Sequence, residues 1–167
     1  NPLGSRSTAN CYVVHAPGFY RFPMVYGNGI KNGIANEQAF RNNRQGTSSG
    51  YWCHLLNHAN AFIFSPYIET MCNVNPGEYS AVLLWQDELG VISNTDVMFE
   101  ANDNQSGYVT FIVNPEMIHE CNAVIALKKG DAIVWSWQIW VTDENLAETN
   151  RVTISGKQYD FMKVLLG

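Results

Sequence analysis

The residues best suited to chemistry lie within one stretch of the chain. Residues 46–50 (GTSSG) match G-x-S-x-G, a pattern that holds a serine nucleophile on a strained turn between a strand and a helix. This copy lies in a tract of Asn, Gly and Ser without that context, so we favour a chance match. A hydrolase also needs a histidine, such as His119, beside a carboxylate, and no acid, base and nucleophile converge. We therefore predict no catalytic residues and no enzyme activity.

Two histidines stand at a spacing that can bind metal. His54 and His58 are four positions apart, beside Cys53. On a helix, two imidazoles at this spacing can share a metal ion. The metalloprotease motif also needs a glutamate after the first histidine to activate water, and here that residue is Leu55. His54 and His58 are therefore weak metal candidates, and we predict a structural or adventitious pair without a bound metal.

Two further patterns fall short of a cofactor or cation site. Gly27, Gly29 and Gly33 nearly form a dinucleotide fingerprint, but the third glycine is one place late and no βαβ pattern surrounds it. Three acidic residues could supply oxygen ligands to calcium, but they lack the spacing of an EF-hand, and we interpret them as a solvated loop: Asp143, Glu144 and Glu148. We predict no cofactor.

Four cysteines leave the redox state open. They are Cys11, Cys53, Cys72 and Cys121, without a CxxC motif, so a zinc ribbon or thioredoxin-type site is not expected. Cys53 and Cys72 flank a strand-like segment and are the favoured disulfide pair. The alternative is four buried thiols, because free cysteine is among the most buried residue types.

Three aromatic residues are candidates for ligand binding. Tyr51 and Trp52 lie in a long polar loop, and Trp140 lies opposite the apolar face of its strand. Exposed aromatic rings offer a large contact area at low entropy cost, which suits stacking on a sugar or anchoring a partner. The alternative, which we favour, is that these rings pack under their own loop.

The element that must position these groups is the segment Ala132–Asp143 (AIVWSWQIWVTD). Its odd positions, from Ile133 through Trp135 and Trp137 to Val141, are large and apolar, whereas its even positions are mostly polar. Side chains alternate across a strand, so this pattern predicts a central strand with one fully apolar face. We expect Trp135 and Trp137 to lie in the core.

Short strands separated by turn signals fill most of the remaining chain. They number about eight to ten, the pattern of a sandwich or barrel, and no helical pattern of ten or more residues interrupts them. The fold prediction is an all-β, two-sheet antiparallel β-sandwich, Ig-like or jelly-roll-like. The expected strands are Cys11–His15, Phe19–Tyr26, Ala61–Phe64, Tyr79–Trp85, Val97–Phe99, Tyr108–Val113 and Ala123–Leu127, the last pairing with the Trp-rich strand.

The segment Gly27–Asn60 is expected to be a long loop region. It holds seven Asn and five Gly and shows little periodicity. It carries at most short helices, one of them over Glu37–Asn42, capped by Asn36 and pinned to the core by Phe40.

Domain organisation follows from these elements. Residues 1–7 are predicted to be a linker or cloning remnant, residues 8–156 the sandwich, and residues 157–167 a terminal strand or the start of a following domain. Val152–Ile154 and Tyr159–Leu166 are a candidate hairpin turning at Ser155 and Gly156.

Composition limits the classes of partner. The net charge is -5, which disfavours nucleic acid because little could neutralise a row of phosphates. Only 15% of residues are charged and 18 are asparagine, a polar but uncharged surface that suits an extracellular or periplasmic setting. No apolar run reaches the roughly 18 residues of a membrane helix.

Three segments in a fixed order carry a family resemblance. They are TANCYVVHAPGFYRFPMVYGNGIKNG, SAVLLWQDELGVI and NAVIALKKGDAIVWSWQIWVTD, within residues 8 to 143. Together they resemble a module of Bacteroidetes fimbrillin-like surface proteins, often lipoproteins and many of unknown function. In relatives the Trp-rich strand often reads WSWHIWVTD, and here Gln138 replaces the histidine.

The resemblance implies β-sandwich modules in series at the outer-membrane surface or outside the cell, and a role in adhesion or fimbria assembly. Partners would be other surface or fimbrial subunits, joined by strand addition at the edge containing Pro23 or at Tyr159–Leu166. It implies no catalytic residues. The alternative function is a carbohydrate-binding module that uses the loop around Tyr51 and Trp52.

Overall fold

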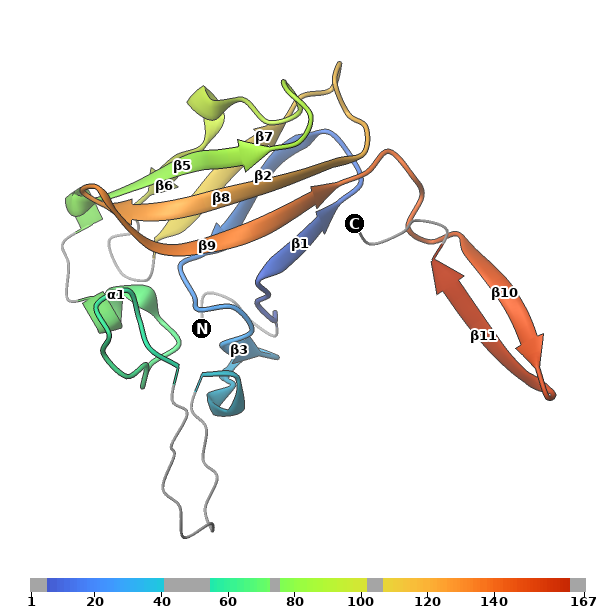
Figure 1. Ribbon diagram of the computed structural model, residues 1–167, viewed down its shortest axis with the longest axis horizontal. Coiled ribbons are helices and arrows are strands. Elements are labelled where there is room, and N and C mark those ends of the chain that lie inside the picture. The colour runs from blue at the N-terminus through green and yellow to red at the C-terminus, as the bar shows by residue number, and fades with distance from the viewer. Residues whose placement is uncertain (1–5, 41–54, 73–75, 102–106, 163–167) are drawn as a thin grey trace, which may run out of the picture.

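The computed structural model describes residues 6–40, 55–72, 76–101 and 107–162 and shows an all-β, sandwich-like fold (Figure 1). Within these ranges, helix is confined to α1 (Ile68–Cys72) and three single 3₁₀ turns, η1 (Glu37–Ala39), η2 (Pro76–Glu78) and η3 (Asn94–Asp96). The predicted fold class is confirmed.

The four-stranded sheet has the order β1-β9-β8-β5. Its strands are β1 (Cys11–Val14), β5 (Tyr79–Gln86), β8 (Cys121–Lys129) and β9 (Ala132–Val141). The predicted β8–β9 hairpin is present, with Gly130 at φ +56° in its turn. The pair β1–β9 is parallel, however, and corrects the purely antiparallel expectation. Parallel neighbours need a long connection, and most of the chain lies between these two strands.

The three-stranded sheet, with the order β2-β7-β6, forms the second layer and lies behind the first in Figure 1. Its strands are β2 (Gly18–Pro23), β6 (Met98–Glu100) and β7 (Tyr108–Val113), all antiparallel. Strand β2 ends at Pro23 and lies at the sheet edge, as predicted, because proline cannot donate to a further ladder.

The core fills the space between these sheets with aliphatic side chains and a group of contacting aromatic rings. Phe22 of β2 lies between Tyr12 of β1 and Trp137 of β9, with ring-centroid distances of 5.1 Å and 4.7 Å. Trp137 is 1% exposed and lies in the core, as predicted, whereas Trp135 is only partly buried and packs against the edge of the same cluster.

A β-bulge corrects the predicted alternation at the start of β9. Leu127 pairs with Trp135 while Lys128 pairs with Ile133, which leaves Val134 without a partner on β8. An extra residue in one strand reverses the facing of the residues before it. Val134 is therefore buried and Ile133 exposed, the reverse of the expected pattern.

The described part of the predicted long loop contains β3 (Ile30–Lys31), β4 (Ile34–Ala35) and the turn η1. Phe40 is buried, as expected. Asn36 does not cap the turn, because its side-chain amide donates to the Asn28 carbonyl instead. The strand expected at Ala61–Phe64 is wrong: Phe62 forms a single bridge with Leu56, since the segment is too short and turn-rich for a ladder.

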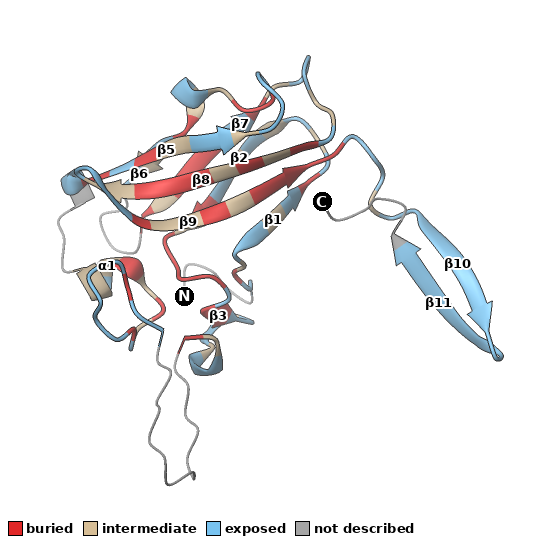
Figure 2. Cartoon of the chain, viewed as in Figure 1, coloured by how far each residue is buried: buried red, intermediate tan, exposed pale blue. Residues whose placement is uncertain are grey.

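The predicted C-terminal hairpin is present as β10 (Thr149–Ile154) and β11 (Lys157–Met162). These strands pair with each other and form a separate two-stranded sheet. The hairpin projects away from the sandwich (Figure 1), and nearly all of it is exposed (Figure 2). The boundary predicted between residues 156 and 157 falls at the hairpin turn, so it separates two strands that form one unit.

Candidate functional site

The hairpin β10–β11 is shaped by its turn and by one ion pair. Ser155 and Gly156 both have positive φ, +51° and +76°, the conformation of the tight turns whose twist matches that of the flanking strands. Arg151 and Asp160 lie opposite each other, and the guanidinium donates two hydrogen bonds to the carboxylate, at 2.7 Å and 3.0 Å. These bonds hold the pKa of Asp160 below its ordinary value.

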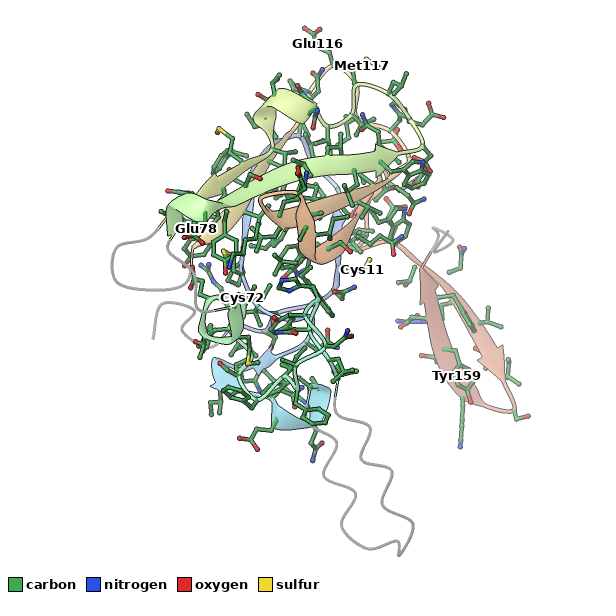
Figure 3. All side chains as sticks on the ribbon, turned by 60° about the vertical axis from the view of Figure 1, so that its left-hand side comes forward. Cys11, Cys72, Glu78, Glu116, Met117 and Tyr159 are labelled. Atoms are coloured by element: carbon green, nitrogen blue, oxygen red, sulfur yellow. The ribbon has the colours of Figure 1, made fainter. Side chains whose placement is uncertain are left out.

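The register divides the hairpin into two chemically different faces. Directly opposite residues share a face, so Val152 lies beside Tyr159 and Ile154 beside Lys157, with Asn150 and Phe161 next to them. The polar face carries Thr149, Arg151, Thr153, Gln158 and Asp160. We call the first set the apolar face of the hairpin; Tyr159 is labelled in Figure 3.

The apolar face of the hairpin is open to solvent. Val152, Ile154, Tyr159 and Phe161 are 43%, 55%, 45% and 53% exposed. An isolated two-stranded hairpin is at best marginally stable in water, and an apolar face of this kind is normally packed against another layer. The hairpin is therefore chemically suited to bind an apolar surface.

The outer face of the four-stranded sheet, away from the core, carries the exposed side chains of Trp85 and Val13 on its two edge strands, with Asn122 and Gln138 between them. There Trp85 of β5 is opposite Val124 of β8, and Val13 of β1 is opposite Trp140 of β9. Trp85 is 52% and Val13 40% exposed. A carboxylate borders this surface, because Asp87 Oδ1 accepts a hydrogen bond from the Asn122 amide N–H at 2.7 Å.

Trp140 lies within this outer face but is only 3% exposed. Its indole N–H donates to Glu120 Oε2 at 3.3 Å, and the buried Thr142 hydroxyl donates to Glu120 Oε1 at 2.5 Å. The covered ring offers no face for stacking, so Trp140 fits the alternative favoured from the sequence, that it is packed and does not bind a ligand.

A hollow of about 250 Å³ lies near the start of β1, beside the β3–β4 region. Trp135 lines it, and the Trp135 indole N–H donates to Asn10 Oδ1 at 3.0 Å. The Tyr26 ring meets Trp135 edge-on, with centroids 5.1 Å apart and planes at 90°. The remaining lining residues are Gly27, Asn28, Ala39 and Leu55. A second hollow of about 350 Å³ shares Asn28 and is lined by Ser7, Thr8, Lys31 and Asn36.

The first hollow is electrically neutral. The one titratable side chain among its described lining residues is Tyr26. Burial raises the pKa of Tyr26 well above its ordinary value, and the nearby Cys72 thiol, 3.9 Å from the hydroxyl, raises it further. Tyr26 is therefore uncharged at physiological pH, and the hollow offers amides and aromatic carbon without a formal charge.

Several predicted site residues lie outside the described residues: Tyr51, Trp52, Cys53, His54 and the 46–50 tract. His58 is described and lies exposed at the surface. Within the described ranges, no group of three or more His, Cys, Asp and Glu side chains could hold a metal ion. His119 Nε2 lies 3.7 Å from Glu88 Oε2 in an exposed pair.

Cys53 lies outside the described residues, so its favoured pairing with Cys72 stays a prediction, and Cys72 is a free thiol in the structure. Its sulfur lies near the Tyr26 hydroxyl, within the packing around α1. Cys11 and Cys121 are free thiols as well, the first exposed and the second buried.

Tyr159–Leu166 was expected from the sequence to join a partner by strand addition, but the apolar face of the hairpin, Trp85 and Asn10 were not identified as functional candidates. The signal for the hairpin was present, because Val152 and Ile154, and likewise Tyr159 and Phe161, alternate with polar residues. No local signal identified Asn10, because it contacts Trp135 only through long-range folding.

Comparisons with protein families, with curated proteins and with solved structures find no match to this chain. Among the helices that the structure describes, none is long and apolar enough to cross a membrane.

Proposed function

We propose that this chain is a non-enzymatic structural module of the extracellular, fimbrillin-like kind, in which the hairpin of one copy binds the outer face of the four-stranded sheet of the next copy. The observation that carries the proposal is the apolar face of the hairpin, which no other described element of the same chain covers. Burial of that face on a second copy removes Val152, Tyr159 and Phe161 from water.

The chemistry of the two surfaces favours a second copy as the partner. The outer face of the sheet offers Trp85 and Val13 for apolar contact. Lys157 on the hairpin supplies one positive charge, and Asp87 beside Trp85 supplies a negative one. Opposite charges at an interface of this kind fix the orientation of the two copies more than they raise the affinity between them.

The two surfaces lie on different parts of the molecule, so the contact is head-to-tail. A head-to-tail contact leaves one free hairpin and one free sheet at the ends of each assembly and can continue into a chain of modules. Serial display of sandwiches is the role expected of a fimbrial or adhesive surface protein. The three segments that resemble fimbrillin-like proteins support the surface location, which protease treatment of intact cells tests directly.

A complementation experiment tests the assembly. One variant carries Val152→Thr and Tyr159→Thr and keeps its sheet; a second carries Trp85→Ser and keeps its hairpin. We expect wild-type chain to form a concentration-dependent series of oligomers in sedimentation velocity, and each variant alone to remain monomeric. An equimolar mixture should form one heterodimer and no longer species, because each partner supplies the surface that the other lacks.

The matched control carries Thr153→Ala and Gln158→Ala, which alter the polar face of the same hairpin. This control should assemble like the wild-type chain. A wild-type chain that stays monomeric at all concentrations would contradict the proposal. So would normal self-association of the Trp85 variant, because that result indicates contact between two hairpins.

A further inference from the structure

We infer that the hollow beside Trp135 binds a single neutral sugar ring. This binding site does not depend on the proposed assembly, since it lies near the start of β1 and not on the hairpin or the outer face of the sheet. The described lining residues combine one aromatic wall with asparagine side chains and carry no formal charge. That combination suits a pyranose, whose axial C–H faces pack on aromatic carbon while its hydroxyls pair with amides.

The aromatic wall is held in a fixed orientation. Trp135 is anchored by the hydrogen bond to Asn10 Oδ1 and by the edge-on contact with Tyr26. Asn10 is itself fixed, because its backbone carbonyl accepts a hydrogen bond from the Gln138 amide N–H at 2.9 Å. A ring held by these two contacts loses little entropy when a ligand packs against it.

The asparagine side chains of the hollow can form hydrogen bonds with the hydroxyl groups of a sugar. Asn10 uses its Oδ1 for the indole, which leaves its amide N–H donors for a ligand. The Asn28 backbone carbonyl accepts a hydrogen bond from the Asn36 side-chain amide at 3.1 Å. The side chain of Asn28 is exposed and contributes a further donor and acceptor. An asparagine amide can donate to and accept from hydroxyl groups. This property suits a sugar, because each of its hydroxyls is both a donor and an acceptor.

Size and charge narrow the class of ligand. The hollow of about 250 Å³ lies below the roughly 300–1,000 Å³ of sites for drug-sized ligands. It therefore fits one ring rather than a chain of rings. The absence of a cationic side chain among its described lining residues disfavours sugar phosphates and sialic acids.

Saturation-transfer NMR with a panel of methyl glycosides tests the site. The probes are the methyl glycosides of glucose, galactose, mannose, fucose and N-acetylglucosamine, with uridine as a neutral heterocycle. We expect transfer to the ring protons of at least one glycoside and weak, millimolar affinity. Asn28→Ala should weaken that affinity about fivefold, the loss of roughly one hydrogen bond. Leu55→Trp, a large ring at an exposed lining position, should abolish binding by filling the hollow.

The matched control is Gln158→Ala, which truncates an exposed amide on the polar face of the distant hairpin and should bind like the wild-type chain. Far-ultraviolet circular dichroism and sedimentation confirm that each variant keeps its fold and its assembly. Absence of transfer to every glycoside would overturn the inference, as would binding unaffected by both Asn28→Ala and Leu55→Trp, or selective binding of uridine. None of these results alters the test of assembly, which uses other residues.

Discussion

Val152 and Tyr159 lie directly opposite each other on β10 and β11, and both side chains remain about half exposed. This pair lies at the centre of the apolar face of the hairpin, and no other described element of the chain packs on that face. The proposed contact between copies depends on that pair.

The hairpin turn should control assembly without affecting the sandwich. Gly156 has φ +76° and open space around its α-carbon, so Gly156→Ala introduces backbone strain alone. That strain costs about 1–2 kcal/mol in the left-handed region. We expect lower protection of the Val152 and Tyr159 amides in hydrogen exchange, weaker oligomerisation and an unchanged sandwich.

Gly77→Ala is the matched control, because Gly77 also has open space but lacks a positive φ. Gly77→Ala should leave the hydrogen exchange of the hairpin amides and the oligomerisation unchanged. Equal protection of the hairpin amides in the Gly156 variant and the wild-type chain would show that the turn does not limit the hairpin.

Two tryptophans should respond in opposite ways to truncation. Trp137 is 1% exposed and contacts Phe22 in the core, so Trp137→Ala should lower the free energy of unfolding by about 3–5 kcal/mol. Trp85→Ala on the outer face should change it by less than about 0.5 kcal/mol while reducing oligomerisation. Urea denaturation of dilute, monomeric protein measures both, and a similar loss at both positions would contradict the assignment of inner and outer faces.

The contact of Glu120 with Trp140 and Thr142 should stabilise the end of β9. Glu120→Ala removes the acceptor for a buried indole N–H and a buried hydroxyl, which should cost about 1–3 kcal/mol in urea denaturation. Glu120→Gln keeps one acceptor oxygen and should retain more than half of that stability. If Glu120→Ala left the unfolding midpoint unchanged, Trp140 would not depend on this carboxylate.

Alkaline pH should destabilise the fold through Cys121. Burial raises the pKa of the Cys121 thiol from 9.0 to about 11, the neighbouring acidic groups adding to that rise. Below pH 9, the pKa of this thiol in the unfolded chain, the stability that the buried neutral thiol contributes is fully present. Between pH 9 and about 11 the thiol ionises in the unfolded chain but not in the folded one, so this contribution to stability is lost. We expect the free energy of unfolding to fall over that window.

Cys121→Ala should make the decline between pH 9 and 10 shallower. Above pH 10 the buried Tyr26 and Tyr79 add a similar decline, because burial raises the pKa of each phenol. An identical pH dependence in the Cys121 variant and the wild-type chain would contradict the role of this thiol.

Local patterns predicted much of the fold but could not predict long-range geometry. The alternation of large apolar residues located β7 and β9, and the Ser155–Gly156 signal located the last hairpin. The bulge at Val134 was not foreseen, since it depends on the register with β8. The parallel pairing of β1 with β9 was missed for a related reason, because sequence alternation carries no strand direction.

The candidate sites were less predictable than the fold. Trp140 was correctly placed on the face opposite Trp137, but sequence could not show that the sheet and Glu120 cover it. The hairpin pattern was visible, yet its separation from the sandwich is a property of the whole chain. Likewise, the contact of Asn10 with Trp135 joins the two ends of the sandwich sequence and has no local signature.

Photo-crosslinking from the hairpin is the most direct test of the proposed contact between the hairpin of one copy and the outer sheet face of the next. Benzoylphenylalanine in place of Tyr159 reacts with the surface that covers the hairpin, and mass spectrometry of mixed isotope-labelled chains separates contacts between copies from contacts within one copy. The account predicts crosslinks between copies, from position 159 to the segments that contain Trp85 and Val124. Crosslinks between two hairpins, crosslinks within one chain only, or no crosslink at any concentration would contradict it.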